Sequence, residues 1–194
     1  MQNNKSQQPL FFVYVALLSA AFFWGSSFPA TKIVLQGFTP VAYVFLRFVG
    51  ASLIFGLLML RRFRRLPRKV HIKLLLMAFF QPTLYFLFES AGLQFTSASS
   101  ASMIIAGIPG VVALLAGFFL KERLSTRQWA GVLLSIAGVI LLAGFDDNPT
   151  YSGSSLLGNG LVILAALSAS MYMIVARHLS ANLSAVELTF YQVF

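Results

Sequence analysis

The chain has 194 residues, of which 58% are hydrophobic and only 10% are charged, whereas soluble domains carry about 25% charged residues. A water-soluble fold of this length could not bury 20 phenylalanines together with the aliphatic side chains, so the composition predicts an all-α polytopic membrane protein. With no cysteine and only two histidines we expect no cofactor and no metal, and the net charge of +9 does not indicate a nucleic-acid partner, because seven of the 14 basic residues lie in the short segment Arg61–Lys73.

Several apolar runs are long enough to cross ~30 Å of hydrocarbon as helices. In chain order the predicted spans are Leu10–Leu35, Pro40–Leu60, Leu74–Phe95, Ala98–Leu120, Gln128–Ala143 and Leu156–Ala176, and a further apolar segment begins at Ser184. Thr39 before Pro40 predicts a capped start of the second span, and Ser125 with Gln128 predicts a capping box before the fifth.

The first span carries residues that weaken a helix near its middle. Pro29 has no backbone N–H and leaves the Gly25 carbonyl without its partner, while Ser26 and Ser27 can supply replacement hydrogen bonds. Such irregularity is tolerated in a membrane beside a cavity or inside packed protein, so we expect a bent helix lining a polar path or a close helix contact. Trp24 either faces a solute or packs in the core or against lipid.

Pro109 is expected to kink the fourth span in the same way.

Two charged residues lie inside the second and third spans. Arg47 follows Pro40 by seven residues and Glu89 precedes Ser97 by eight, which puts both about 10 to 12 Å below the same face of the membrane. Because an unpaired charge at this depth costs several kcal/mol, the matched depth predicts an ion pair if the two spans face one another. The pair would either fix two helices together or serve solute binding and proton coupling.

Other polar side chains lie on the same face of each helix as the charged residue. Tyr43 and Arg47 are four residues apart on the second span, and Gln81, Tyr85 and Glu89 follow at four-residue steps on the third. The two stripes of polar side chains could line one cavity. The candidate solute or coupling residues are therefore Trp24, Ser27, Tyr43, Arg47, Gln81, Tyr85 and Glu89.

The distribution of basic residues predicts the orientation. Cytoplasmic connections of membrane proteins are rich in lysine and arginine. The basic connection after the second span contains Arg61, Arg62, Arg64, Arg65, Arg68 and Lys69, whereas residues 144–157 carry two aspartates and no basic residue. We expect a cell-membrane protein with a cytoplasmic tail at residues 1–9, an outer loop at 144–157, and contact of the basic segment with anionic lipids.

The chain also contains a weak internal repeat. Shifting it by 145 residues aligns Ala20-Ala21 with Ala165-Ala166, Lys32 with Arg177, and Phe45 with Phe190. Since five spans separate the copies, the second copy would cross the membrane in the opposite direction. Inverted repeats of this kind are typical of secondary transporters.

The order of several short motifs resembles the EamA-like branch of the drug/metabolite transporter superfamily. These motifs are Trp24-Gly25-Ser26-Ser27-Phe28 leading to Lys32, Pro40 to Leu46-Arg47-Phe48, Thr96 to Ala101, Pro109, and Phe119 to Leu124 with Gln128, Gly131 and Gly138. The resemblance implies a carrier of ten helices in two inverted five-helix repeats. Residues 10–143 would form the first repeat and 158–194 the start of the second, so that this chain resembles a carrier truncated at about the seventh helix.

The function that this resemblance implies is alternating-access transport, with export favoured, of amino acids, other small metabolites or drugs. A proton or a counter-solute is the coupling partner to consider. A channel or a non-transporting membrane subunit is the alternative. An intramembrane enzyme is disfavoured because His71 and His178 lie at the membrane edges and the spans contain no nucleophile with an adjacent base.

Overall fold

The computed structural model describes residues 10–59, 66–119, 121, 124–144, 155–180, 183 and 185–193, and every regular element in these ranges is helical. The elements are α1 (Leu10–Val34), α2 (Pro40–Met59), α3 (Arg68–Ala78), α4 (Tyr85–Phe95), α5 (Ala98–Ala106), α6 (Ile108–Phe119), α7 (Thr126–Gly144), α8 (Ser155–Leu179) and α9 (Ala185–Val193). Within the described ranges, five continuous helical stretches are long and apolar enough to cross a membrane. The predicted all-α polytopic fold is confirmed.

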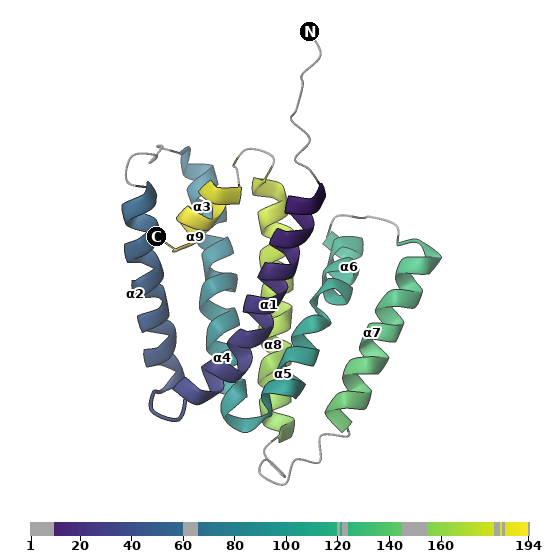
Figure 1. Ribbon diagram of the computed structural model, residues 1–194. Helices are drawn as coiled ribbons and strands as arrows, with labels where there is room; N and C mark the ends of the chain where they lie inside the picture. The colour runs from purple at the N-terminus through teal and green to yellow at the C-terminus, as the bar shows by residue number, and fades with distance from the viewer. Residues whose placement is uncertain are drawn as a thin grey trace.

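Consecutive spans run up and down (Figure 1). The upper end of the bundle, as drawn there, contains the starts of α1, α3, α7 and α9 and the ends of α2, α6 and α8; the lower end contains the ends of α1, α4 and α7 and the starts of α2, α5 and α8. Helices α1 and α8 therefore point in opposite directions, which is the relation that an inverted repeat requires. Short α9 packs against α2 and α3 near the upper end.

Two predicted helix starts have the expected hydrogen bonds. The Thr39 hydroxyl accepts the Ala42 amide at 3.3 Å, and Pro40 is the first residue of α2. Before α7, Gln128 Oε1 accepts the Ser125 amide at 2.8 Å and Ser125 Oγ accepts the Gln128 amide at 3.4 Å. Both caps satisfy donors that a helix leaves unpaired in its first turn.

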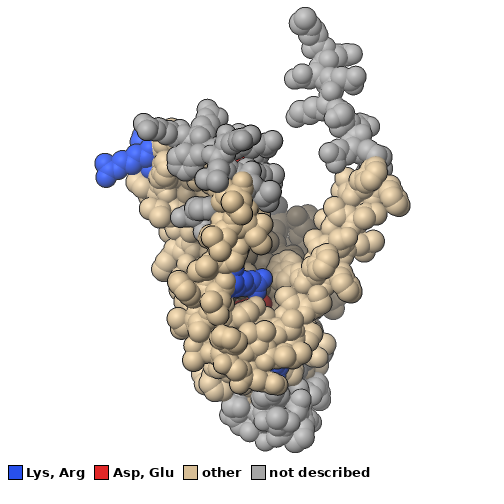
Figure 2. Space-filling model, turned by 60° about the vertical axis from the view of Figure 1, so that its left-hand side comes forward, with Lys and Arg blue, Asp and Glu red and all other residues tan. Residues whose placement is uncertain are grey.

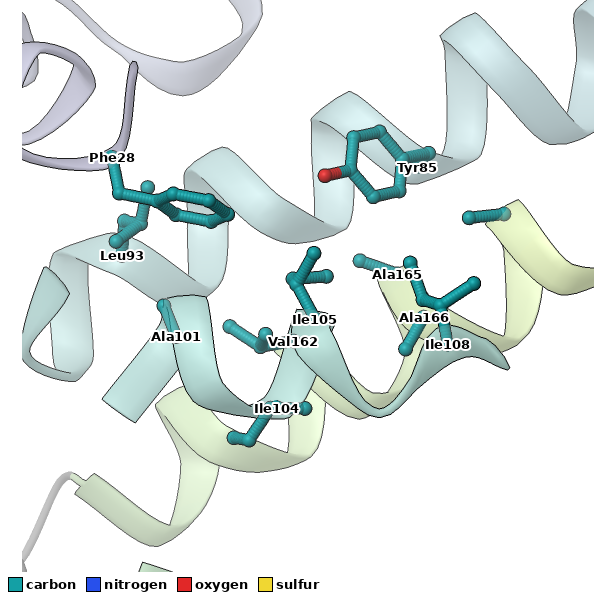
Figure 3. Close-up of a cluster of buried hydrophobic side chains, with 11 residues drawn as sticks. Phe28, Tyr85, Leu93, Ala101, Ile104, Ile105, Ile108, Val162, Ala165 and Ala166 are labelled. Atoms are coloured by element: carbon teal, nitrogen blue, oxygen red, sulfur yellow. The ribbon is translucent and has the colours of Figure 1, made fainter. Parts of the chain in front are cut away.

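Helix α8 is the centre of the bundle and packs on α3, α4, α5 and α6. More than half of the buried residues of α8 are glycine, alanine or serine, and at Gly158 an added Cβ atom would lie 2.8 Å from the Thr96 nitrogen and 2.9 Å from the Gly92 carbonyl oxygen. The backbones of α4 and α8 thus approach closely because side chains are missing at the crossing. Figure 3 shows the apolar core around this contact, to which α1, α4, α5, α6 and α8 contribute Phe28, Tyr85, Leu93, Ala101, Ile104, Ile105, Ile108, Val162, Ala165 and Ala166.

Two spans are interrupted. The third runs from Arg68 to Phe95, but Gln81 is in an extended conformation (φ −144°, ψ 119°), just before Pro82. The fourth is divided at Gly107, where α5 ends, and Pro109 is the second residue of α6. Proline removes one backbone donor in each case, so the helix cannot continue its regular ladder.

Helix α1 is continuous through Pro29, and of the five stretches long and apolar enough to span a membrane, α1 and α2 have the smallest buried share. In α8, 44% of the most apolar window is buried, compared with 6% in α1. Burial on α1 is confined to its lower third, where Phe28 and Thr31 are enclosed, whereas the residues from Phe11 to Ser26 are exposed.

Candidate functional site

A chain of hydrogen bonds joins α1 to the arginine inside α2. Thr31 of α1 and the Tyr43 hydroxyl lie 2.9 Å apart and share a hydrogen bond. The Arg47 guanidinium donates to the same Tyr43 hydroxyl through Nη1 at 3.0 Å. The prediction that Tyr43 and Arg47 share one side of their helix is confirmed. The Tyr43 hydroxyl lies between Thr31 and Arg47 and bonds to both.

A second polar group is buried on α4. The Tyr85 hydroxyl donates to Oε1 of Glu89 at 3.0 Å, one helical turn further along. Both side chains are buried, with exposed fractions of 1% and 3%. The Trp24 side chain also approaches the Tyr85 hydroxyl and brings α1 to the same point. A carboxyl group in this setting needs the hydrogen bond because water cannot replace it.

Arg47 and Glu89 do not form the direct ion pair that their matched depth predicts. Among the described residues, no carboxylate lies within salt-bridge distance of Arg47, whose guanidinium instead stacks 4.3 Å from the centre of the Phe86 ring. Helices α2 and α4 are nevertheless neighbours. The charged groups have other partners instead: Arg47 contacts Tyr43 and Phe86, and Glu89 accepts a hydrogen bond from Tyr85.

This set of side chains, Trp24, Thr31, Tyr43, Arg47, Tyr85, Phe86 and Glu89, is called the polar cluster below. Beside it, an open apolar groove of about 560 Å³ follows the upper half of α2, and its lining consists of α2 residues outside the polar cluster: Phe45, Phe48, Val49, Ser52, Leu53, Gly56 and Leu57. Phe48 belongs to this lining, and its ring lies 5.4 Å from that of Phe86. Figure 2 shows blue atoms, with a few red atoms behind them, in a hollow at mid-height of the face; further blue atoms are visible at the upper left and near the lower end.

The remaining predicted residues lie near the polar cluster without joining it. Ser26 and Ser27 donate to the carbonyl oxygens of Phe23 and Trp24, at 3.1 and 2.6 Å, and not to the Gly25 carbonyl as predicted. A hydroxyl in a helix reaches back to the carbonyl three or four residues earlier, which explains the difference.

Gln81 does not continue the helical stripe of Tyr85 and Glu89. The stripe assumes an unbroken helix, and the extended backbone at Gln81 interrupts it. Pro82 was the sequence signal for this break.

Of the basic segment, Arg68 and Lys69 are the first residues of α3 and are exposed, whereas Arg61, Arg62, Arg64 and Arg65 lie outside the described residues.

Sequence reasoning missed a polar group at the lower end. Lys32 Nζ donates to the carbonyl oxygen of Leu93 at 2.9 Å and to that of Thr96, and the Thr96 hydroxyl donates to Asn159 Oδ1 at 2.6 Å. Lys32 was already conspicuous as a lysine at the end of an apolar span. Its acceptors are main-chain atoms, however, and no residue type marks these in a sequence.

The fold and the polar cluster define a polytopic helical membrane protein with charged side chains at mid-span beside an open groove along α2. Residues 11–144 match the EamA-like transporter family, and the chain belongs to this family. Its relatives are described as transporters, and the family is the one that the sequence motifs resembled, which points to a transporter rather than an enzyme.

The chain is similar to named transporters from bacteria and archaea. It is 34% identical over 182 residues to the uncharacterized transporter YcxC of Bacillus subtilis, covering 91% of this chain and 57% of the relative. An uncharacterized transporter of Archaeoglobus fulgidus is 26% identical, with 91% and 61% covered, and a chloroplastic WAT1-related protein of Arabidopsis thaliana is 32% identical, with 88% and 42% covered. The chain thus spans about half the length of these relatives. No solved structure matches it.

Proposed function

We propose that the chain provides one side of the solute path of a secondary transporter, which moves a small organic solute by alternating access. The observation that carries this proposal is the polar cluster: a guanidinium and a carboxyl group lie at mid-span, each held by a tyrosine and not by the other. Charged side chains inside a membrane are costly and are retained where they serve a solute or ion path.

The route to the polar cluster is supported by the groove along α2. It extends from the upper half of the helix to Phe48, directly beside the ring on which Arg47 stacks. This open groove, with a volume of about 560 Å³, is large enough to admit a small organic molecule. A solute entering from the upper end would therefore meet the guanidinium first.

The orientation proposed for this transporter puts the upper end in the cytoplasm. Among the described basic residues, Arg68, Lys69, Lys73, Lys121, Arg127 and Arg177 all belong to the upper end of the bundle, whereas Lys32 belongs to the lower end. Positive charge is concentrated on the cytoplasmic side of membrane proteins. We further propose that transport runs toward the outside and is coupled to a proton or a counter-solute. The proposed cargo is an amino acid or a related metabolite.

Counterflow in proteoliposomes tests the proposal. The complete protein is reconstituted in vesicles loaded with a mixture of unlabelled amino acids, and uptake of the same radiolabelled mixture is followed over time. We expect saturable uptake that is lost in Arg47→Gln and in Glu89→Gln but retained in Lys73→Gln, which alters an exposed residue at the upper end of α3. Ohmic currents without saturable uptake would contradict a carrier and favour a channel.

A further inference from the structure

We propose that Lys32 is a positioning residue of this transporter, which ties the lower end of α1 to the α4–α5 connection and keeps the solute path closed at that end. The group of Lys32, Leu93, Thr96 and Asn159 is called the lower latch. The inference rests on the proposed function, because closing one end has a meaning only for a protein that opens its two ends in turn.

The acceptors of Lys32 are the carbonyl groups that a helix leaves unpaired. Helix α4 ends at Phe95, so the carbonyls of its last turn lack partners within the helix and form the negative end of its dipole. Lys32, in the last turn of α1, donates to the Leu93 carbonyl oxygen at 2.9 Å and to the Thr96 carbonyl oxygen. The ammonium group of Lys32 thus donates hydrogen bonds to two carbonyl oxygens at the end of α4.

Thr96 passes this connection on to α8. Its hydroxyl donates to Asn159 Oδ1 at 2.6 Å, and both side chains are buried. Immediately beside them, Gly92 and Gly158 let the two helices touch. Helices α4 and α8 therefore form a rigid pair at the lower end, and Lys32 fastens α1 to this pair through charge-assisted hydrogen bonds.

Above the lower latch, the described helices cover little of α1, although Trp24 approaches the Tyr85 hydroxyl there. The residues from Phe11 to Ser26 are exposed, and an added Cβ atom at Gly25 would meet no heavy atom within 4 Å. Pro29 lies between this loose part and the latch and removes the hydrogen bond to the Gly25 carbonyl. The helix is weakest at the boundary, so releasing Lys32 would let the lower third of α1 move separately from the rest.

The lower latch also connects to the polar cluster. Thr31 directly precedes Lys32 and bonds to Tyr43, which in turn receives the guanidinium of Arg47. A movement of the lower third of α1 would therefore shift the groups that orient Arg47. This gives Lys32 an effect on solute binding although it lies below the polar cluster.

Cysteine labelling tests the lower latch, because the chain contains no cysteine of its own. The reporter is Ser27→Cys, a half-buried position that lies about 7.5 Å above Lys32 along the helix. A membrane-impermeant maleimide is applied to the complete protein, separately from each face of the membrane. Lys32→Ala is expected to raise the labelling rate about tenfold from one face only, since losing a charge-assisted hydrogen bond shifts a two-state equilibrium by about that factor.

Three controls separate a latch from a general stabilising contact. Lys32→Arg retains a cationic donor and should restore slow labelling, and Lys73→Ala should leave the rate unchanged. Ala165→Cys, a fully buried position of α8, should stay unlabelled in the Lys32→Ala background. Unchanged Ser27→Cys labelling in a folded Lys32→Ala protein would overturn the proposal, as would equal increases from both faces or labelling of Ala165→Cys. None of these readouts requires solute transport, so a failed counterflow experiment and a failed latch are distinguishable.

Discussion

Substituting Gly158 by alanine should destabilise the protein, because the crossing of α4 and α8 has no room for a side chain. The added Cβ would lie 2.7 Å from the Phe95 carbonyl carbon, 2.8 Å from the Thr96 nitrogen and 2.9 Å from the Gly92 oxygen, whereas ordinary contacts begin at 3.4 Å. All three neighbours are main-chain atoms that cannot rotate away. The helices would have to separate by about 0.5 to 0.7 Å.

We expect a loss of about 1 to 3 kcal/mol in the free energy of unfolding, the usual cost of overpacking a closely packed contact. At roughly 2 to 4 °C per kcal/mol for a chain of this size, the melting temperature should fall by several degrees. The measurement is thermal unfolding of the detergent-solubilised protein, followed by size-exclusion chromatography with fluorescence detection.

Gly160, two residues further along α8, provides the matched control. An added Cβ there would meet no heavy atom within 4 Å, and alanine favours the helix by up to about 1 kcal/mol over glycine. Gly160→Ala should therefore melt at or above the temperature of the unmodified protein. If Gly158→Ala and Gly160→Ala melted alike, close packing of α4 on α8 would not be what holds the centre of the bundle.

Three further substitutions test single polar groups by the same unfolding measurement. Ser90→Ala should raise the melting temperature, because the buried Ser90 hydroxyl has no hydrogen-bond partner among the described residues; a fall would reveal a partner. Thr96→Val should cost about 1 to 3 kcal/mol by leaving Asn159 Oδ1 buried without its donor, and no loss would show that this bond contributes little. Tyr85→Phe should cost a similar amount by removing the donor to Glu89, whereas an unchanged melting temperature would mean that water replaces the tyrosine.

Interactions within one helix could be predicted closely. The capping box of Ser125 and Gln128, and the bonds from Tyr85 to Glu89 and from Arg47 to Tyr43, all join residues three or four apart in the chain. Helical geometry alone brings such positions together. The prediction was wrong at Gln81. It required a continuous helix from Gln81 to Glu89, whereas the backbone is extended at Gln81, just before Pro82.

Contacts between helices could not be predicted from the sequence. The residues that meet at the lower latch are 61 to 64 positions apart, and two of the acceptors are main-chain carbonyls. Whether Arg47 would meet Glu89 or Phe86 depended on how α2 is rotated against α4. Depth in the membrane follows from counting residues, but rotation about the helix axis depends on packing with neighbours.

The sequence by itself determined that the chain crosses a membrane repeatedly, and where most crossings begin and end. Bilayer thickness and hydrophobicity set these features, and both act on each segment separately. The tertiary structure alone decided that α8 lies at the centre, that Arg47 stacks on Phe86, and that Lys32 fastens α1 to α4. In lipid, the hydrophobic effect does not choose between neighbouring helices, so shape and hydrogen bonds between surfaces from distant parts of the chain make that choice.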